Sequence, residues 1–98
     1  MRPLIVATGF ALILAVPAHA ASDDAWEAFR SDVETACLAA AESLFEVPQV
    51  RVDPFGSESY GLALVTGKAR GADAEIAAIC VFDKQTKAVE IGGELPTD

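Results

Sequence analysis

An apolar stripe at helical spacing is the feature that most constrains how this chain can fold. Between residues 22 and 45 the apolar side chains recur in steps of three and four, which places them on one face of an α-helix. The stripe consists of Trp26, Phe29, Val33, Cys37, Ala40 and Leu44. The Ser-Asp-Asp run at 22–24 supplies N-cap candidates, and Pro48 disfavours helical geometry just before it, so we expect the helix to end near Phe45.

Beyond Pro48 the apolar residues follow a period of two, which is typical of β-strands. Pro54 limits the first run to a short or edge strand. The runs that fit this pattern are 49–52, 60–66, 75–82 and 88–91. Glycine and polar residues between and after them predict a mobile polar loop over 67–73, a hairpin turn over 83–87 and a polar tail after Gly93.

This order of elements predicts a single α+β domain. One N-terminal amphipathic helix would pack on a four-stranded antiparallel meander, because a helix with one apolar stripe and a sheet with one apolar face bury each other. The third strand is apolar on both faces, and its second face carries Ala77, Ile79 and Val81. Such a face must be covered by more protein, so we expect these three residues to form a partner or dimer face.

The chain has two cysteines, one in the helical stripe and one in the third strand. In an oxidising compartment, an even cysteine count favours a bridge, here a helix-to-strand disulfide between Cys37 and Cys80. Closing a loop of about forty residues would restrict the unfolded chain by about 4 kcal/mol. The alternative is a pair of buried free thiols. Two cysteines alone are too few ligands for zinc, so we expect no metal site and no cofactor.

The first twenty residues have the pattern of a cleavable signal peptide. Arg2 precedes an apolar run over 4–16, and Pro17 is followed by the small-x-small motif Ala18-His19-Ala20. The sequence therefore predicts a signal peptide at 1–20 and one domain at 21–98, in the periplasm or secreted. An uncleaved anchor is the alternative, but the apolar run falls short of the ~20 residues needed to span a bilayer. We expect no stable membrane insertion after cleavage.

Charge and histidine content limit the chemistry of the predicted domain. A formal net charge of −8 repels phosphates, which argues against nucleic acid as a partner. The single histidine, His19, lies in the predicted signal peptide, so serine or cysteine catalysis would lack its usual base. Carboxylate pairs at Asp53 with Glu58 and at Asp73 with Glu75 are explained more simply as surface residues. We therefore expect no catalytic residue.

The strand-turn-strand segment at the end of the domain resembles a known family. The similarity lies in the run Ala78-Ile79-Cys80-Val81-Phe82-Asp83-Lys84-Gln85-Thr86-Lys87-Ala88-Val89 and in the two strands before it, Gln49–Val52 and Tyr60–Val65. With these segments, the last part of the domain is similar to a PepSY domain. That family usually has an Asp-x-x-Thr-Gly turn, and Lys87 stands where the glycine would be. The resemblance implies a binding module that restrains peptidases or other partners, and it carries over no catalytic residue.

Three functions remain open from these residues. The leading hypothesis is an exported binding module that restrains or senses a partner protein through the sheet face and neighbouring loops. A structural homodimer formed through the same face is the second. The third is an enzyme that uses surface carboxylates or a bound metal. Another periplasmic inhibitor fold, similar to lysozyme inhibitors, would share the predicted size, signal peptide and disulfide.

Overall fold

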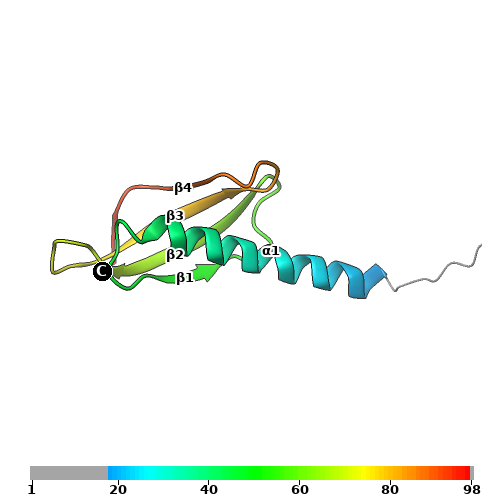
Figure 1. The fold of residues 1–98 in the computed structure, drawn as a ribbon, viewed down its shortest axis with the longest axis horizontal. Helices are drawn as coiled ribbons and strands as arrows, with labels where there is room; N and C mark the ends of the chain where they lie inside the picture. Colours follow the sequence, from blue (N-terminus) through cyan, green and yellow to red (C-terminus); the bar gives the residue numbers. More distant parts are fainter. Residues whose placement is uncertain (1–17, 98) are drawn as a thin grey trace, which may run out of the picture.

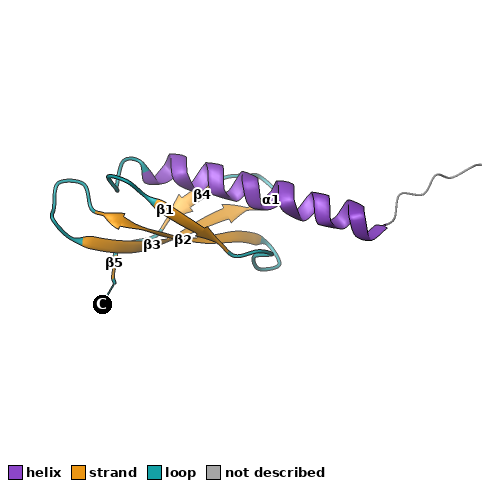
Figure 2. Ribbon diagram, turned by 90° about the horizontal axis from the view of Figure 1, so that it is seen from below, coloured by secondary structure: helices purple, strands orange, loops and turns teal. Residues whose placement is uncertain are grey.

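One helix lies across one face of an antiparallel sheet (Figures 1 and 2). A computed structural model describes residues 18–97. The elements are α1 (Ala18–Ala41), β1 (Gln49–Val52), β2 (Tyr60–Lys68), β3 (Glu75–Asp83), β4 (Val89–Ile91) and β5 (Leu95–Pro96). The strands β1 to β4 are neighbours in sequence order, and every pairing is antiparallel. The predicted α+β fold, with a helix packed on a meander, is confirmed.

Helix α1 differs from its predicted bounds at both ends. It begins at Ala18, so the predicted caps at 22–24 lie inside the helix. It ends at Ala41, whose carbonyl oxygen accepts hydrogen bonds from the backbone N–H groups of both Leu44 and Phe45 at 3.0 Å. This tight turn replaces the predicted last helical turn. Phe45 is therefore completely buried, whereas Leu44, predicted as part of the stripe, is 40% exposed.

The core lies between α1 and the face of the sheet that the helix covers. Its fully buried large side chains are Phe45, Val33, Val65, Cys37 and Cys80. Gly61 of β2 permits the close approach of the helix, since a Cβ there would lie 2.7 Å from Cγ2 of Val33. The predicted disulfide joins Cys37 of α1 to Cys80 of β3, with a Cα–Cα distance of 6.0 Å. The helix is thus tied covalently to a central strand.

Strand β2 extends beyond its predicted end at Thr66. Gly67 and Lys68 belong to β2, and Ala69 forms an isolated bridge with Phe45 and is buried. The backbone N–H of Arg70 donates to the Leu44 carbonyl at 2.9 Å, and its Nε donates to the Glu42 carbonyl at 2.6 Å. The prediction of a polar loop is therefore wrong for residues 67–70, because the turn after α1 pairs with them.

The predicted polar tail after Gly93 contains a fifth strand. Leu95 of β5 is paired with Ala77 of β3, and Pro96 is paired with Ile76. Strand β4 is paired with β3 further along the same edge, where Cys80 faces Ile91. The chain therefore returns to β3 after Gly92 and Gly93. The predicted polar tail is therefore a short strand at Leu95 and Pro96, which the sequence does not predict.

Most of the predicted signal peptide lies outside the described residues. The structure describes nothing of residues 1–17, and residues 18–20 form the first positions of α1. Within residues 18–97, none of the helices combines the length and the apolar character needed to cross a membrane. The predicted cleavage after Ala20 remains a prediction.

Candidate functional site

The face of the sheet opposite α1, hereafter the outer face, carries an apolar patch at its centre. In the register of β2 and β3, Leu62 is paired with Val81 and Leu64 with Ile79. These four residues are called the outer patch. Ile79 is 47% exposed and the other three are half-buried. Antiparallel sheets with one solvated face usually place polar residues there, so the outer patch departs from that pattern.

The three residues predicted for a partner or dimer face differ in exposure. Ile79 and Val81 belong to the outer patch, but Ala77 is only 7% exposed. Strand β5 lies beside it and places Leu95 opposite Ala77 on the same face. Leu95 is exposed, so it presents the apolar surface that Ala77 does not. No sequence signal for Leu95 was recognised, because a two-residue strand has no periodicity to detect.

Opposite charges lie on the two sides of the outer patch. Arg51 of the edge strand β1 is paired with Leu64. Glu90 of β4, on the other side, is paired with Val81. Both charged residues are exposed. The outer face is therefore basic along β1 and acidic along β4, with apolar side chains between.

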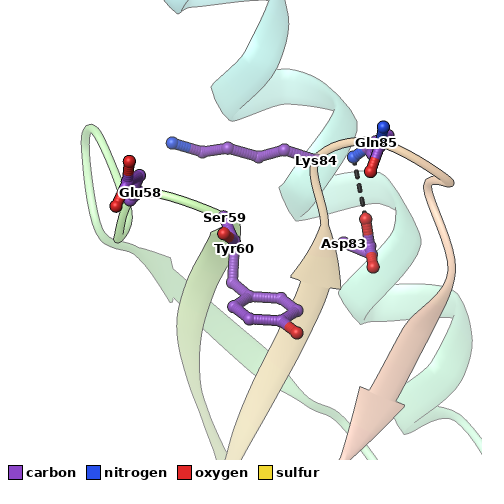
Figure 3. Close-up of a pocket in the computed structure, with 6 residues that line it drawn as sticks. All are labelled: Glu58, Ser59, Tyr60, Asp83, Lys84 and Gln85. Atoms are coloured by element: carbon purple, nitrogen blue, oxygen red, sulfur yellow. Dashed lines mark hydrogen bonds between the residues drawn. The ribbon is translucent and has the colours of Figure 1, made fainter.

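A shallow depression of about 380 Å³ lies at one end of the sheet, where β2 begins and β3 ends (Figure 3). Its lining residues are Glu58, Ser59, Tyr60, Asp83, Lys84 and Gln85. Lys84 extends away from Asp83 toward the loop that carries Glu58. Its ammonium donates hydrogen bonds to the carbonyl oxygens of Phe55 at 2.9 Å and Ser57 at 2.7 Å. The lysine thus holds the β1–β2 loop (residues 53–59).

Two aromatic rings of α1 lie close to the same ammonium. It lies 5.3 Å from the ring centroid of Trp26 and 5.1 Å from that of Phe29. The Trp26 ring meets Phe55 edge to face at 4.9 Å, and Phe29 meets Phe82 at 6.3 Å. The sequence favours core positions over a ligand pocket for four aromatic residues, Trp26, Phe29, Phe82 and Tyr60. Phe82 is buried, and Trp26 and Phe29 are half-buried. The expectation is wrong for Tyr60, which is 43% exposed and lines the depression. The contact between Trp26 and Phe55 joins the β1–β2 loop to α1.

Asp83 organises the hairpin turn between β3 and β4. Its Oδ1 accepts hydrogen bonds from the backbone N–H groups of Thr86 at 3.0 Å and Gln85 at 2.8 Å. These two bonds hold the pKa of Asp83 below its ordinary value of 3.8, and the bond from Thr86 has the larger effect. Lys87 follows in the left-handed region with a φ of 69°, at the position where the PepSY turn has glycine. The predicted hairpin turn is therefore formed.

The carboxylate pairs considered in the sequence have structural roles or lie exposed. Asp53 Oδ1 accepts hydrogen bonds from the N–H groups of Phe55 at 3.2 Å and Gly56 at 3.0 Å, which closes the turn after β1. Glu58, Asp73 and Glu75 are exposed. Within residues 18–97, no three histidine, cysteine or acidic side chains come together in a group that could hold a metal ion.

Comparison with known proteins identifies no relative of this chain. No protein-family model matches it, and neither the curated proteins nor the solved structures give a match.

Proposed function

We propose that this chain is an exported, non-catalytic binding module that restrains or senses a partner protein through its outer face. The observation that carries the proposal is the outer patch. Figure 2 shows that α1 covers only one face of the sheet. The register and burial of β2 and β3 place the four apolar side chains on the other face. Partly exposed apolar side chains that gather at one place are typical of interaction sites rather than of solvated sheet faces.

Export is supported by two independent features. Residues 1–20 have the charged start, apolar run and small-x-small end of a signal peptide. The Cys37–Cys80 disulfide is of the kind that persists in oxidising compartments such as the periplasm or the exterior of the cell. We therefore place the working protein there, with residues 21–98 as its mature chain.

The PepSY resemblance supports a regulatory role within this proposal. The segment that carries it, from Ala78 to Val89, forms the β3–β4 hairpin. Ile79 and Val81 of this segment belong to the outer patch. The partner we propose is accordingly a peptidase or another exported protein that the outer face restrains. An inhibitor similar to lysozyme inhibitors is the alternative with the same surface.

A homodimer is the second candidate, and the charges around the outer patch favour it. If two outer faces pack against each other about a two-fold axis parallel to the strands, the β1 side of one copy covers the β4 side of the other. Arg51 of each copy then lies on the same side as Glu90 of its partner copy, about 7 Å from it along the strands, which long side chains can bridge. The apolar patches meet at the centre. The surface is thus self-complementary in charge as well as in hydrophobicity.

The test replaces Ile79 by aspartate. Ile79 is half exposed, so the change places a charge in the outer patch without filling the core. Val47→Asp is the matched control, because Val47 is an apolar residue that is 74% exposed in the turn between α1 and β1. Ala77→Asp is unsuitable because Ala77 is buried and the charge would destabilise the fold itself.

The secreted proteins of the native host are passed over immobilised wild-type protein and over both variants. A protein that the wild type retains is identified and purified, and its affinity for each of the three is measured. We expect Ile79→Asp to weaken that affinity at least tenfold and Val47→Asp to leave it unchanged. Equal binding by all three folded proteins would refute the proposal. Light scattering tests the homodimer as the second candidate. If the protein is a dimer, Arg51→Glu should make it monomeric, and the double variant Arg51→Glu with Glu90→Arg should restore the dimer.

A further inference from the structure

Strand β1 has an unpaired edge in the described part of the chain. It is hydrogen-bonded to β2 on one side, with Asp53 N–H donating to the Leu62 carbonyl at 2.8 Å just beyond the strand end. Backbone groups of an antiparallel strand alternate in direction, so Arg51 and Asp53 face β2 while Val50 and Val52 point their N–H and C=O groups away from it. Such a row of outward groups is a template for another strand.

A groove lies beside this edge, between β1 and α1. It has a volume of about 400 Å³ and is lined by Glu27, Arg30, Ser31, Glu34, Val50 and Val52. The two valine side chains are half-buried and form an apolar floor. The helical residues form a polar wall at spacings of three and four, which place them on one face of α1. A strand added to β1 would direct every second side chain into this groove.

The wall of the groove is acidic. Glu27 and Glu34 are exposed and make no ion pair with another described residue. Arg30, which lies between them, is engaged elsewhere. Its Nη1 donates to the Pro54 carbonyl at 3.1 Å, and its guanidinium lies 5.9 Å from the centroid of the Phe55 ring. Arg30 keeps its positive charge, but the two carboxylates outweigh the single guanidinium, so the wall has a net negative charge. The chain as a whole carries −8.

We propose that the β1 edge binds an extended basic segment of a partner protein as an added strand. Main-chain hydrogen bonds to Val50 and Val52 would supply affinity, as in other cases of strand addition. Lysine or arginine side chains directed toward α1 would pair with Glu27 and Glu34. The two carboxylates are about 10 Å apart along the helix. Side chains two residues apart on a strand are about 7 Å apart, and long basic side chains bridge that difference.

Two prolines define the length of the added strand. Pro48 precedes β1 and Pro54 follows it closely. Neither proline has an N–H group to donate, so pairing is limited to the segment between them. This surface is separate from the outer patch, since Val50 and Val52 face the helix side of the sheet. A partner can therefore occupy the edge whether or not the outer face is occupied.

The experiment uses a capped nonapeptide of alternating lysine and valine, with a glutamate–valine peptide as the charge control. Binding to the full mature protein is followed by backbone amide NMR and by hydrogen exchange. The lysine peptide should shift the amide signals of Val50 and Val52 and slow their exchange at least tenfold. The glutamate peptide should do neither. If the lysine peptide binds without protecting these amides, or does not bind at all, the proposal is overturned.

Two variants separate strand addition from general charge attraction. Glu27→Gln with Glu34→Gln should weaken binding about fivefold, as expected for two exposed ion pairs. Asp73→Asn with Glu94→Gln removes the same charge from exposed positions outside the groove and should leave affinity unchanged. Val50→Pro removes an outward N–H that β2 does not use and should abolish amide protection at Val52. Equal losses in both charge variants would refute a specific edge site.

Discussion

The ammonium of Lys84 lies 5.3 Å from the centroid of the Trp26 ring, which joins the β3–β4 turn to the first half of α1. The two residues are far apart in sequence, and both contact the β1–β2 loop. Lys84 also donates to two carbonyl oxygens of that loop, on Phe55 and Ser57. One lysine therefore fastens a loop, a turn and a helix at the same end of the sheet.

Replacing Lys84 by methionine should loosen this end of the molecule. Methionine keeps the apolar length but loses the charge that interacts with the rings and carbonyls, so we expect a loss of about 1–2 kcal/mol in the free energy of unfolding. Urea denaturation followed by Trp26 fluorescence measures it. Gln85→Met, in the same turn, is the control and should change stability little. Equal stability of Lys84→Met and the wild type would contradict the fastening role.

Removing the disulfide should lower the free energy of unfolding more than any single substitution of an exposed residue. The Cys37–Cys80 bond closes a loop with a sequence separation of 43 residues, and both sulfurs are fully buried. We expect the double variant Cys37→Ala with Cys80→Ala to lose about 4 kcal/mol in the free energy of unfolding. Denaturation of the wild type in reductant, with full reduction verified by mass, is the companion measurement. An unchanged unfolding midpoint in the reduced protein would contradict the prediction.

Gly61 should not tolerate alanine. The added Cβ would lie 2.7 Å from Val33 Cγ2 and 3.0 Å from Phe29 Cζ, so the helix must move outward. We expect Gly61→Ala to lower the free energy of unfolding by about 1–3 kcal/mol. Gly93→Ala is the matched control, because no atom lies within 4 Å of the position its Cβ would take. If the contact with Val33 causes this loss, Val33→Ala should lower the free energy of unfolding less in the Gly61→Ala variant than in the wild type.

The contribution of Asp83 should depend on pH. Hydrogen bonds from Thr86 and Gln85 lower its pKa in the folded state, so the carboxylate stabilises the fold above its ordinary pKa of 3.8. That contribution is lost as the pH falls through the lowered folded value. The stability difference between the wild type and Asp83→Asn should therefore shrink between about pH 6 and about pH 2. Urea denaturation across this range measures it, and a difference that does not change would contradict the assignment.

Glycine at position 87 should stabilise the hairpin. Lys87 has a φ of 69°, which L-residues adopt at a cost and glycine does not. We expect Lys87→Gly to raise the free energy of unfolding by about 0.5–1 kcal/mol after the greater freedom of glycine in the unfolded chain is counted. Lys87→Ala keeps the backbone cost and is the control. Thermal unfolding compares them, and equal stability of the two variants would contradict this explanation.

The periodicity of the sequence was sufficient to predict α1 and the strands β1 to β4 but not β5, and together with the two cysteines it predicted the disulfide. Steps of three and four around Val33 and Cys37 indicated the helix, and period-two runs indicated β1 to β4. Cys37 lies in the helical stripe and Cys80 in a period-two strand. Their pairing followed from these two local patterns and from the even number of cysteines in the chain. Local patterns of this kind are read from neighbouring residues, so they need no knowledge of contacts between distant parts of the chain.

Only the tertiary structure decided where the helix turns away, which faces are covered and which surfaces remain. Phe45 is buried in place of Leu44 because Ala69, distant in sequence, forms a bridge with it. Leu95 joins β3 and covers Ala77, which leaves Ile79 as the exposed residue of the predicted face. The groove beside Val50 likewise requires α1 and β1 to be placed together. These features depend on pairing between distant segments, which periodicity along a single segment does not encode.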